Sequence, residues 1–572
     1  MKTQTGAARI CEALEKANVR CVFGLPGTQT VELFEALRRS SVRTVVPSNE
    51  LSAAFMAGGW ARVTGEPGVL LTIPGPGFTW ALTGVAEARL DSIPLLHISG
   101  APASAPPDKR FRQQELAQAA IATPMVKAVI EPDDDSDLGV ALLECLALAR
   151  SGEPGPVLLQ VSSTSLSRER TYAALQPVPL AAINPLALES VCARLRDARR
   201  PILMMGQGTN KFAESIRTLV DQVRAPLLTT PSARGVLPED HPLNFGFDPF
   251  AASIRDVNEL VKSSDLILVV GCKLAHSGTA GFQLELPVDR LVHVDASTDV
   301  VGANYRASLG VVADAGDLLR ALVASAPARS SWTEDELEAW RVRFAVRTKG
   351  SRESRIAGTS AADARGFFEA LRRAMPIDAI LVLDSGSHQI VARRYYRVLT
   401  PRGLITPTNL QSMGFAIPTA IGAKLAEPKR AVVALLGDGG FAMTALELLT
   451  AVREKVSLVV IVFVDGAFGQ IRMQQLANYG VSYGVALETP DLRLLAESIG
   501  ARHEMVGDND AESVVRCALG HSGVTVIEVR VGDTLAIRRT AAVARARDVT
   551  RRLTGPGVLR FAKQLIRGLR RR

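Results

Sequence analysis

Cysteine is scarce in this sequence: there are six residues in 572, widely spaced and without a CxxC pair. Disulfide frameworks and cysteine-bound metal centres have closer spacings, so we expect reduced, mostly buried thiols and a cytoplasmic protein. Long hydrophobic runs are also missing, since an apolar stretch such as Leu458–Val464 has strand length and a bilayer requires about 20 residues. The N-terminus lacks a basic segment followed by an apolar one, so no secretion signal is expected.

Positive charge is not in excess outside the C-terminal end. The net charge is +8, but Arg538–Arg572 holds 12 Lys/Arg and one acid, so the rest of the chain sums to −3. A body with this balance does not favour nucleic acid as a partner. The tail also has apolar residues at helical spacing, from Val558 to Leu569. We weigh docking of this tail on the body of the protein or on a partner, contact with an anionic surface, and a solvated tail.

Short apolar runs alternate with amphipathic segments, which predicts an α/β fold with parallel sheets. We expect three doubly wound domains, at 1–167, 186–326 and 356–535, and a basic C-terminal extension at 536–572. Polar segments between them are interpreted as linkers. The predicted strands are Thr44–Val46, Gly68–Ile73, Leu95–Ile98, Val157–Val161, Ile202–Met205, Leu227–Thr229, Leu266–Val270, Leu291–Val294, Ile380–Leu383, Ala431–Leu436, Leu458–Val464 and Thr525–Val529.

The strongest motif follows the predicted strand that ends at Leu436. It reads Gly437-Asp438-Gly439-Gly440, and a helix is expected after it, at about Phe441–Arg453. Glycines at a strand-to-helix turn let backbone N–H groups approach a diphosphate, and the helix directs its positive end at the anion. Asp438 offers the hard oxygen that Mg²⁺ prefers.

A second acidic residue follows the next predicted strand. Asp465 begins Asp465-Gly466-Ala467-Phe468-Gly469, and 25 residues separate it from Gly439. One helix and one strand fill this interval, so both aspartates should emerge at the same edge of the sheet, where α/β proteins bind ligands. The pattern predicts a site for a diphosphate and a divalent cation.

Further motifs occur in order along residues 1–535. They are Phe23-Gly24-Leu25-Pro26-Gly27, Asn49-Glu50, Gly75-Pro76-Gly77, Asp91-Ser92-Ile93-Pro94, Gly386-Ser387-His388-Gln389 and Met413-Gly414-Phe415-Ala416-Ile417-Pro418. With the diphosphate motif, they resemble the acetolactate synthase (acetohydroxyacid synthase) large subunit and its relatives, which depend on thiamine diphosphate (ThDP) and Mg²⁺. The resemblance implies a pyrimidine-binding, a central and a diphosphate-binding domain. It also implies a homo-oligomer with active sites at a dimer interface.

The resemblance assigns Glu50 as the catalytic residue. In this family a glutamate here bonds to N1′ of the aminopyrimidine, and the shared proton helps to activate the cofactor. The alternative is that Glu50 caps the helix that starts there.

The remaining roles are also carried over by resemblance. Asp438, Asp465 and the carbonyl of Ala467 would bind the metal, although the family has Asn where this chain has Asp465. Met413 would be the apolar wedge under the cofactor, and the carbonyl of Gln411 would accept from its 4′-amino group. The other cofactor-binding candidates are Pro26, Gly27, Gly77, Ser387, His388, Gly437, Gly439, Gly440, Gly466, Phe468 and Gly469.

The chain departs from acetolactate synthases at substrate positions. Ser277 stands where they have the arginine that holds the carboxylate of the second substrate, so a bidentate clamp is missing. Gln474 stands near the tryptophan that narrows their acceptor pocket. The candidates for the substrate channel are Phe78, Phe111, Gln114 and Gln474. We weigh FAD at Gly206-Gln207-Gly208 and do not expect it, because a lone GxG motif is weak.

The sequence therefore predicts cleavage or ligation of a C–C bond beside a 2-oxo acid carbonyl. The leading hypothesis is decarboxylation of pyruvate or a similar 2-oxo acid and transfer of the acyl carbanion to an acceptor. The alternatives are a simple 2-oxo acid decarboxylase, a 2-hydroxyacyl lyase or carboligase, and, more remotely, a non-catalytic ThDP-fold subunit.

Overall fold

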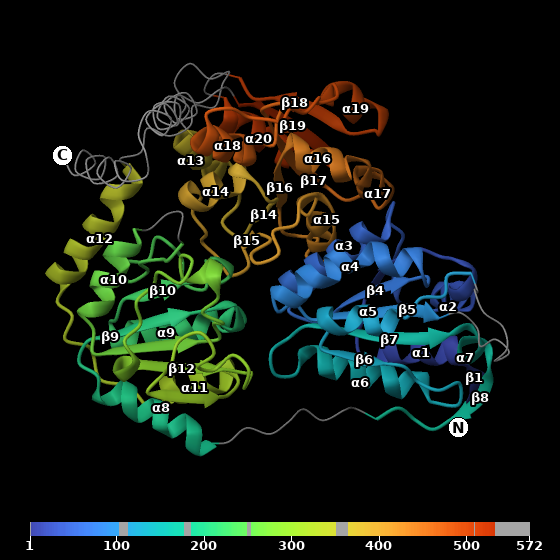
Figure 1. The fold of residues 1–572 in the computed structure, drawn as a ribbon, viewed down its shortest axis with the longest axis horizontal. Helices are drawn as coiled ribbons and strands as arrows, with labels where there is room; N and C mark the ends of the chain where they lie inside the picture. The colour runs from blue at the N-terminus through green and yellow to red at the C-terminus, as the bar shows by residue number, and fades with distance from the viewer. Residues whose placement is uncertain are drawn as a thin grey trace, which may run out of the picture.

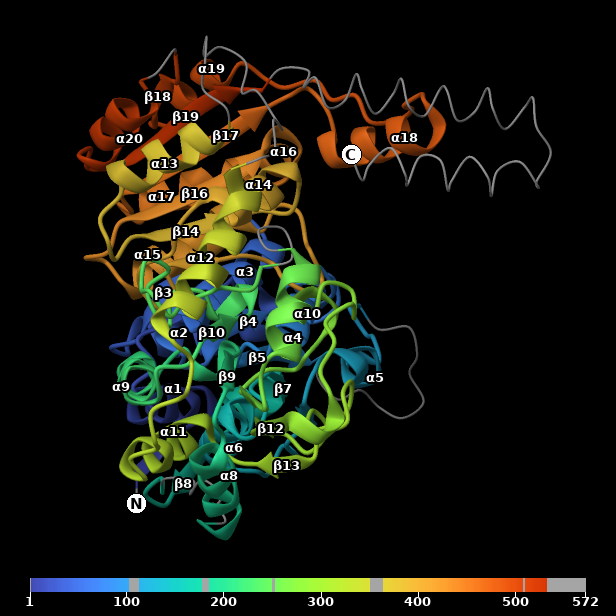
Figure 2. The same ribbon diagram turned by 90° about the vertical axis from the view of Figure 1, so that its left-hand side faces the viewer.

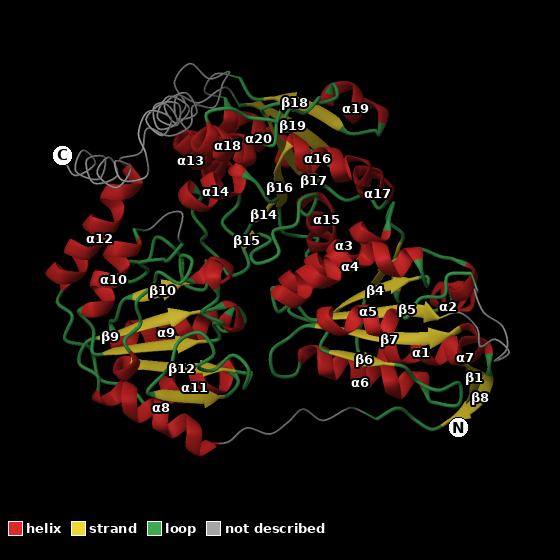
Figure 3. Ribbon diagram, in the orientation of Figure 1, coloured by secondary structure: helices red, strands yellow, loops and turns green. Residues whose placement is uncertain are grey.

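The computed structural model describes residues 2–101, 113–176, 185–248, 253–349, 364–507 and 510–531 (Figure 1). Three parallel-sheet domains are visible, with helices on both faces of each sheet (Figure 3). The three predicted α/β domains are therefore confirmed as the fold. The predicted basic extension and its contacts lie outside the described residues, as does Phe111.

The N-terminal domain has a six-stranded sheet in the order β3-β2-β4-β5-β7-β6. A small antiparallel pair, β1 (Lys2–Thr5) with β8 (Glu169–Tyr172), adds to it, so the segment expected as a linker begins with a strand. The elements are β2 (Cys21–Gly24), β3 (Arg43–Val45), β4 (Gly68–Thr72), β5 (Leu95–Ala101), β6 (Ala128–Ile130), β7 (Pro156–Ser162), α1 (Gly6–Lys16), α2 (Val31–Arg38), α3 (Glu50–Thr64), α4 (Pro76–Leu90), α5 (Gln118–Ala122), α6 (Leu138–Arg150) and α7 (Ser163–Ser167).

The central domain has a five-stranded sheet in the order β10-β9-β11-β12-β13. Its core strand β11 is Leu-Ile-Leu-Val-Val and is fully buried, as expected for a strand covered on both faces. The elements are α8 (Pro185–Asp197), β9 (Pro201–Met205), α9 (Ala213–Val223), β10 (Leu227–Thr229), α10 (Ile254–Lys262), β11 (Leu266–Val270), β12 (Leu291–Asp295), β13 (Leu309–Val312), α11 (Ala315–Ala324) and α12 (Glu334–Lys349).

The C-terminal domain has a six-stranded sheet in the order β15-β14-β16-β17-β19-β18. Figure 2 shows that α18 stands out from the body of this domain. The elements are α13 (Ala364–Ala374), β14 (Ile380–Leu383), α14 (Ser387–Tyr395), β15 (Leu404–Ile405), α15 (Ala416–Ala426), β16 (Val432–Gly437), α16 (Asp438–Thr444), the 3₁₀ turn η7 (Ala445–Glu447), α17 (Leu448–Arg453), β17 (Leu458–Val464), α18 (Gly469–Tyr479), α19 (Leu492–Ser498), β18 (Arg502–Met505), α20 (Ala511–Leu519) and β19 (Val524–Arg530).

The first and third sheets have the same strand order when each is numbered from its own first strand. In both, the order reverses between the first and the third strand: β2 and β4 in one domain, β14 and β16 in the other. Ligands bind outside the carboxyl ends of strands at such a switch point. The motifs found in the sequence follow these strands, so the topology brings each motif group to a binding edge.

The N- and C-terminal domains pack through α3 and α15. The carbonyl of Thr419 lies where a Cβ on Gly59 would be, at 2.2 Å, and the carbonyl of Met56 does the same for Gly422, at 2.0 Å. These close approaches require glycine at both crossings. The rings of Phe55 and Phe415 meet edge-on at 5.3 Å beside them.

A buried ion pair joins the central and C-terminal domains. Arg393 on α14 donates from Nε and Nη2 to Asp248 at 2.8 and 3.1 Å, and both residues are nearly inaccessible to solvent. Arg234 donates to the carbonyls of Arg393 and Tyr396, at 2.9 and 2.6 Å.

Replacing Arg393 by Ala is expected to lower the free energy of unfolding by about 3–5 kcal/mol, because the buried Asp248 carboxylate loses its bidentate partner. The measurement is the urea midpoint. Arg255→Ala is the control, since Arg255 is largely exposed and pairs with Glu259 on its own helix. That variant should change the free energy by less than about 1 kcal/mol. Equal midpoints for the two variants would contradict the prediction.

Within the described part of the chain, no helix is both long and apolar enough to cross a membrane. All six cysteines are free thiols, and five of them are buried.

Candidate functional site

Three helices begin at one edge of the C-terminal sheet. α14, α16 and α18 follow β14, β16 and β17, whose carboxyl ends lie side by side. α16 begins at Asp438, three residues earlier than the sequence suggested, so Asp438 lies in its first turn. Free N–H groups and the positive helix ends make this edge suited to an anion.

Asp438 is buried and holds two loops together. Its Oδ1 accepts from the N–H of Gly439 at 2.9 Å, and its Oδ2 accepts from the N–H of Gly466 at 2.8 Å and from the Thr489 hydroxyl at 3.0 Å. These bonds orient the carboxylate at the switch point between β14 and β16.

Asp465 lies close enough to Asp438 for their charges to interact. Burial, and then the charge of Asp438, raise the pKa of Asp465, while Arg472 opposes the rise. Arg472 Nη2 lies 3.5 Å from Asp465 Oδ2, and Asp465 Oδ1 accepts from the N–H of Ala467 at 3.2 Å. Two neighbouring carboxylates are a ligand set that fits Mg²⁺, and Mg²⁺ bound by carboxylates also takes the oxygens of a diphosphate.

The glycines of this edge leave no room for side chains. A Cβ on Gly439 would lie 2.9 Å from the ring of Phe468, and one on Gly469 would lie 2.3 Å from Asp465 Oδ2 and 3.6 Å from Ser387 Oγ. A Cβ on Gly440 would lie 3.1 Å from Asp384. These distances show that the residues predicted to bind the diphosphate, on α14, α16 and α18, lie next to one another.

His388 is buried beside Gly437. Its Nε2 lies 3.1 Å from the carbonyl oxygen of Asp384, so the proton is assigned to Nε2, which donates to that oxygen. Burial lowers the pKa of His388 to about 4, and the ring is neutral at pH 7. His388 therefore lines the edge as an uncharged group, with Nδ1 as an acceptor.

The loop with Gln411 and Met413 is held in an unusual conformation. Gln411 has φ 63°, and its side chain donates back to the carbonyls of Pro407 and Thr408 at 2.7 and 2.9 Å. Asp384 accepts from the N–H groups of Gly414 and Ala416, at 3.1 and 2.9 Å. The Gln411 side chain is thus occupied, and Met413 is half-buried at the turn.

Glu50 is the first residue of α3 and is 8% exposed. The side chain of Asn49 caps the helix, accepting from the N–H of Ser52 at 2.8 Å, so capping does not explain Glu50. Among the described residues, no hydrogen bond to the Glu50 carboxylate is seen. A Cβ on Gly77 would lie 2.9 Å from Glu50 Oε1, so glycine keeps space in front of it.

Other N-terminal candidates surround this position. Gly27 packs on Ile73, where a Cβ would lie 2.3 Å from Cγ2, and Pro26 is exposed beside it. Gln114 has φ 61° and accepts from Gln29 at 2.6 Å, next to Gly75. The structure thus makes two groups of site residues, one at each switch point.

Two substrate candidates lie away from these groups. Phe78 is in the core, fully buried and stacked on His97 with ring centroids 5.7 Å apart, because its helix face packs on the sheet. Gln474 is exposed on the projecting helix α18. A fully buried side chain does not line a channel, so we do not propose Phe78 as a substrate contact.

Ser277 lies against the Gln411 loop. Its hydroxyl donates to the carbonyl of Thr408 at 2.9 Å, the same oxygen that Gln411 Nε2 approaches. The position where acetolactate synthases have arginine thus holds a short side chain that is already hydrogen-bonded.

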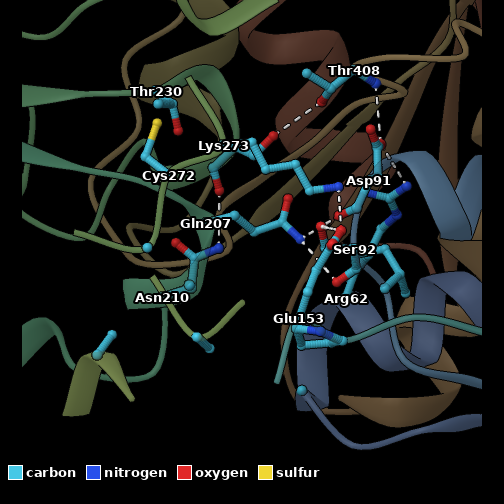
Figure 4. A pocket seen from close by; sticks show the side chains of 18 of the residues that line it. Arg62, Asp91, Ser92, Glu153, Gln207, Asn210, Thr230, Cys272, Lys273 and Thr408 are labelled. Carbon is cyan, nitrogen blue, oxygen red and sulfur yellow. Dashed lines mark hydrogen bonds and ion pairs between the residues drawn. The ribbon is translucent and has the colours of Figure 1, made fainter. Parts of the chain in front are cut away.

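A cavity of about 620 Å³ lies between the three domains (Figure 4). Lys273 reaches across it to Glu153 and to the carbonyl of Leu90, and Gln207 donates to the carbonyl of Asp91 at 2.6 Å. Gly206 and Gly208 pack on Gly271, where a Cβ on Gly206 would lie 2.1 Å from its carbonyl oxygen. The expectation that FAD is not bound here stays a prediction.

Three buried carboxylates at the site were not singled out from the sequence. Asp384 follows β14 as Asp438 follows β16, so the end-of-strand rule could have found it. Glu447 accepts from the N–H of Ser48 at 3.1 Å, and Glu87 accepts from that of Ser412 at 3.1 Å. No local pattern marks Glu447 or Glu87, because their partners are distant in sequence.

Family models match this chain in three parts. The N-terminal TPP binding domain of thiamine pyrophosphate enzymes matches residues 4–121, their central domain matches 188–322, and their C-terminal TPP binding domain matches 384–529. The chain belongs to the thiamine pyrophosphate enzyme family, thiamine pyrophosphate being another name for ThDP.

Individual relatives cover nearly the whole chain. A probable 2-ketoarginine decarboxylase of Pseudomonas aeruginosa is 32% identical, over 92% of this chain and 94% of its own length. The large subunit of acetolactate synthase isozyme 1 of Escherichia coli is 29% identical, over 88% and 92%. A probable acetolactate synthase large subunit of Methanocaldococcus jannaschii is 28% identical, over 88% and 87%. The prediction of a ThDP-dependent, acetolactate-synthase-like enzyme for 2-oxo acid chemistry is confirmed.

Proposed function

We propose that this enzyme decarboxylates a 2-oxo acid and transfers the acyl group to an acceptor carbonyl that has no carboxylate of its own. The C–C bond to the carboxylate breaks, carbon dioxide leaves, and a new C–C bond forms to the acceptor. The observation that carries the choice of acceptor is Ser277, a short side chain bonded to Thr408 at the position of the family's carboxylate-binding arginine.

The cofactor would be held by groups from both switch points. When bound, ThDP supplies a carbon nucleophile for the 2-oxo carbonyl and takes up the electron pair released with carbon dioxide. Asp438, Asp465 and the Ala467 carbonyl would hold Mg²⁺, and the starts of α14 and α16 would hold the diphosphate. Met413 would pack against the cofactor, and the Gln411 carbonyl would accept a hydrogen bond from its amino group. Glu50 would exchange a proton with its pyrimidine ring.

The second candidate function is simple decarboxylation, in which a proton replaces the acceptor. The missing clamp at Ser277 also favours it, and a relative at 32% identity is named a decarboxylase of 2-ketoarginine. A 2-oxo acid with a cationic side chain is therefore a substrate to include in any test.

We also propose a homodimer in the cytoplasm. Apolar residues stand exposed on one side of the α16–α17 segment, with Met443 at 52%, Leu446 at 61% and Leu449 at 45%, and such a patch is typical of an interface. The free thiols support a reducing compartment. Sedimentation of the purified full chain tests the dimer.

Product analysis distinguishes the two functions. The purified chain with ThDP and Mg²⁺ is given pyruvate, longer 2-oxo acids and 2-ketoarginine, each with and without an acceptor aldehyde, and the products are identified by mass spectrometry. A hydroxyketone that contains both carbon skeletons supports transfer. Aldehyde alone supports simple decarboxylation. Acetolactate formed from two pyruvate molecules would contradict the role given to Ser277, because the acceptor in that product is itself a 2-oxo acid.

A further inference from the structure

Two carboxylates from α4 hold the loop that carries Gln411 and Met413. Asp91, which ends the helix, accepts from the N–H groups of Thr408 and Asn409, each at 3.1 Å. Glu87 lies four residues earlier, and its Oε2 accepts from the N–H of Ser412 at 3.1 Å. Residues four apart share a helix face, so one face of α4 supports both ends of this loop.

The bond from Glu87 reaches a particular peptide unit. The N–H of Ser412 and the C=O of Gln411 belong to the same planar trans peptide, in which the two groups point in opposite directions. A bond to the N–H therefore fixes the direction of the Gln411 carbonyl, away from α4. A negative charge at the N–H end also strengthens the carbonyl as an acceptor, because hydrogen bonds in a chain polarise one another.

The backbone conformation of the loop requires support of this kind. Gln411 has φ 63°, which is uncommon for a residue with a side chain. An unusual backbone conformation persists when its surroundings determine it, and here they are Glu87 on one side and Asp384 on the other.

Glu87 is not explained by packing. It is 1% exposed, and its Oε1 has no hydrogen-bond partner within the described residues. Two other buried polar atoms in the same group, Ser412 Oγ and Arg62 Nε, also lack one there. A buried carboxylate costs free energy that an apolar side chain would avoid, which points to a functional reason for it.

The charges around Glu87 are few. Burial and, second, the charge of Asp91 raise the pKa of Glu87 to about 7, while the charge of Arg62 on α3 and the hydrogen bond from the Ser412 N–H oppose the rise. The 408–412 loop contributes no charged side chain. Glu87 thus changes its charge close to neutral pH.

We propose that Glu87 is a positioning residue for the reaction. It acts through the Gln411–Ser412 peptide, which it orients and polarises, so that the Gln411 carbonyl is a stronger and correctly directed acceptor for the hydrogen bond from the amino group of the cofactor. The inference rests on the proposed function, which gives the Gln411 carbonyl that role. Glu87 itself does not touch substrate or cofactor. Its ionised form supports turnover, and its protonated form supports it less.

Glu87→Gln is the decisive variant, because the amide oxygen can still accept from Ser412 and cannot ionise. The affinity for ThDP should stay within about threefold, while kcat at pH 8.5 should fall about tenfold, since a charge-assisted bond is roughly twice as strong as a neutral one. At pH 5.5, where Glu87 is protonated in the unmodified enzyme, the two kcat values should agree.

The ratio of the two kcat values isolates Glu87 from its neighbour Asp384. Burial also raises the pKa of Asp384 to about 7, but Asp384 is present in both proteins and cancels in the ratio. Arg62→Gln is a second variant that leaves Glu87 in place. Removal of its positive charge should raise the pKa of Glu87 and move the acidic limb of the kcat–pH profile to higher pH.

Asp137→Asn is the control for a general loss of stability. Asp137 pairs with buried Arg9 elsewhere in the N-terminal domain, at 2.7 Å. This variant should lower the melting temperature without changing the kcat–pH profile. The proposal is overturned if Glu87→Gln has the kcat of the unmodified enzyme at pH 8.5. It is also overturned if Glu87→Gln and Arg62→Gln both have the kcat–pH profile of the unmodified enzyme. If the unmodified chain binds no ThDP, the proposed function fails instead.

Discussion

Replacing Glu50 by Gln is expected to leave ThDP bound and to slow H/D exchange at C2 of its thiazolium ring by about 10²–10⁴-fold, the usual contribution of a positioned acid or base. Glutamine has the size of glutamate and cannot share a proton with N1′ of the pyrimidine. The structure leaves the Glu50 carboxylate free of hydrogen bonds among the described residues, and Gly77 keeps space in front of it.

The measurement is the NMR signal of the C2 proton after rapid dilution into heavy water. Glu35→Gln serves as the control, because Glu35 lies on the surface of α2 and pairs with Arg38 and Arg39. It should exchange at the unmodified rate. If Glu50→Gln did the same, Glu50 would have no part in activation.

Replacing Asp438 by Asn is expected to weaken Mg²⁺-dependent binding of ThDP by about 100-fold or more, beyond the 10–100-fold that loss of a supporting group costs a metal site. An amide has one acceptor oxygen, whereas Asp438 accepts from Gly439, Gly466 and Thr489 with two. The amide nitrogen would therefore face a donor, and the charge that attracts the metal would be lost.

Asp465→Asn is the matched control. Acetolactate synthases, which this chain resembles, have asparagine at this position, so the variant should bind ThDP within about tenfold of the unmodified enzyme. Calorimetric titration with and without Mg²⁺ checks both variants, and chelation of the metal should abolish binding by the unmodified chain. Equal affinities for the two variants would refute the unequal roles given to the two aspartates.

Local patterns predicted much of this protein because they are short-range. Every strand range named from the sequence falls on an observed strand, since buried parallel strands are continuous apolar runs. The two aspartates after β16 and β17 were found because strand ends of a parallel sheet share an edge. Helix starts were less exact: α16 begins at Asp438, because the glycine motif forms the first turn of the helix.

Contacts between distant segments could not be predicted from local patterns. Glu87 and Ser412 are 325 positions apart, and so no periodicity or motif connects them. Phe78 lies next to the Gly77 motif and yet points into the core, because consecutive residues of a helix face different directions.

The sequence by itself determined the cofactor chemistry and the class of fold, because glycines, acids and apolar runs act through local geometry that each segment carries with it. Tertiary structure alone decided how the Gln411–Ser412 peptide is aimed, that Asn49 and not Glu50 caps α3, and that Ser277 is bonded to the loop. Each of these depends on which surfaces the packed domains bring within hydrogen-bond distance, and that is a property of the whole chain.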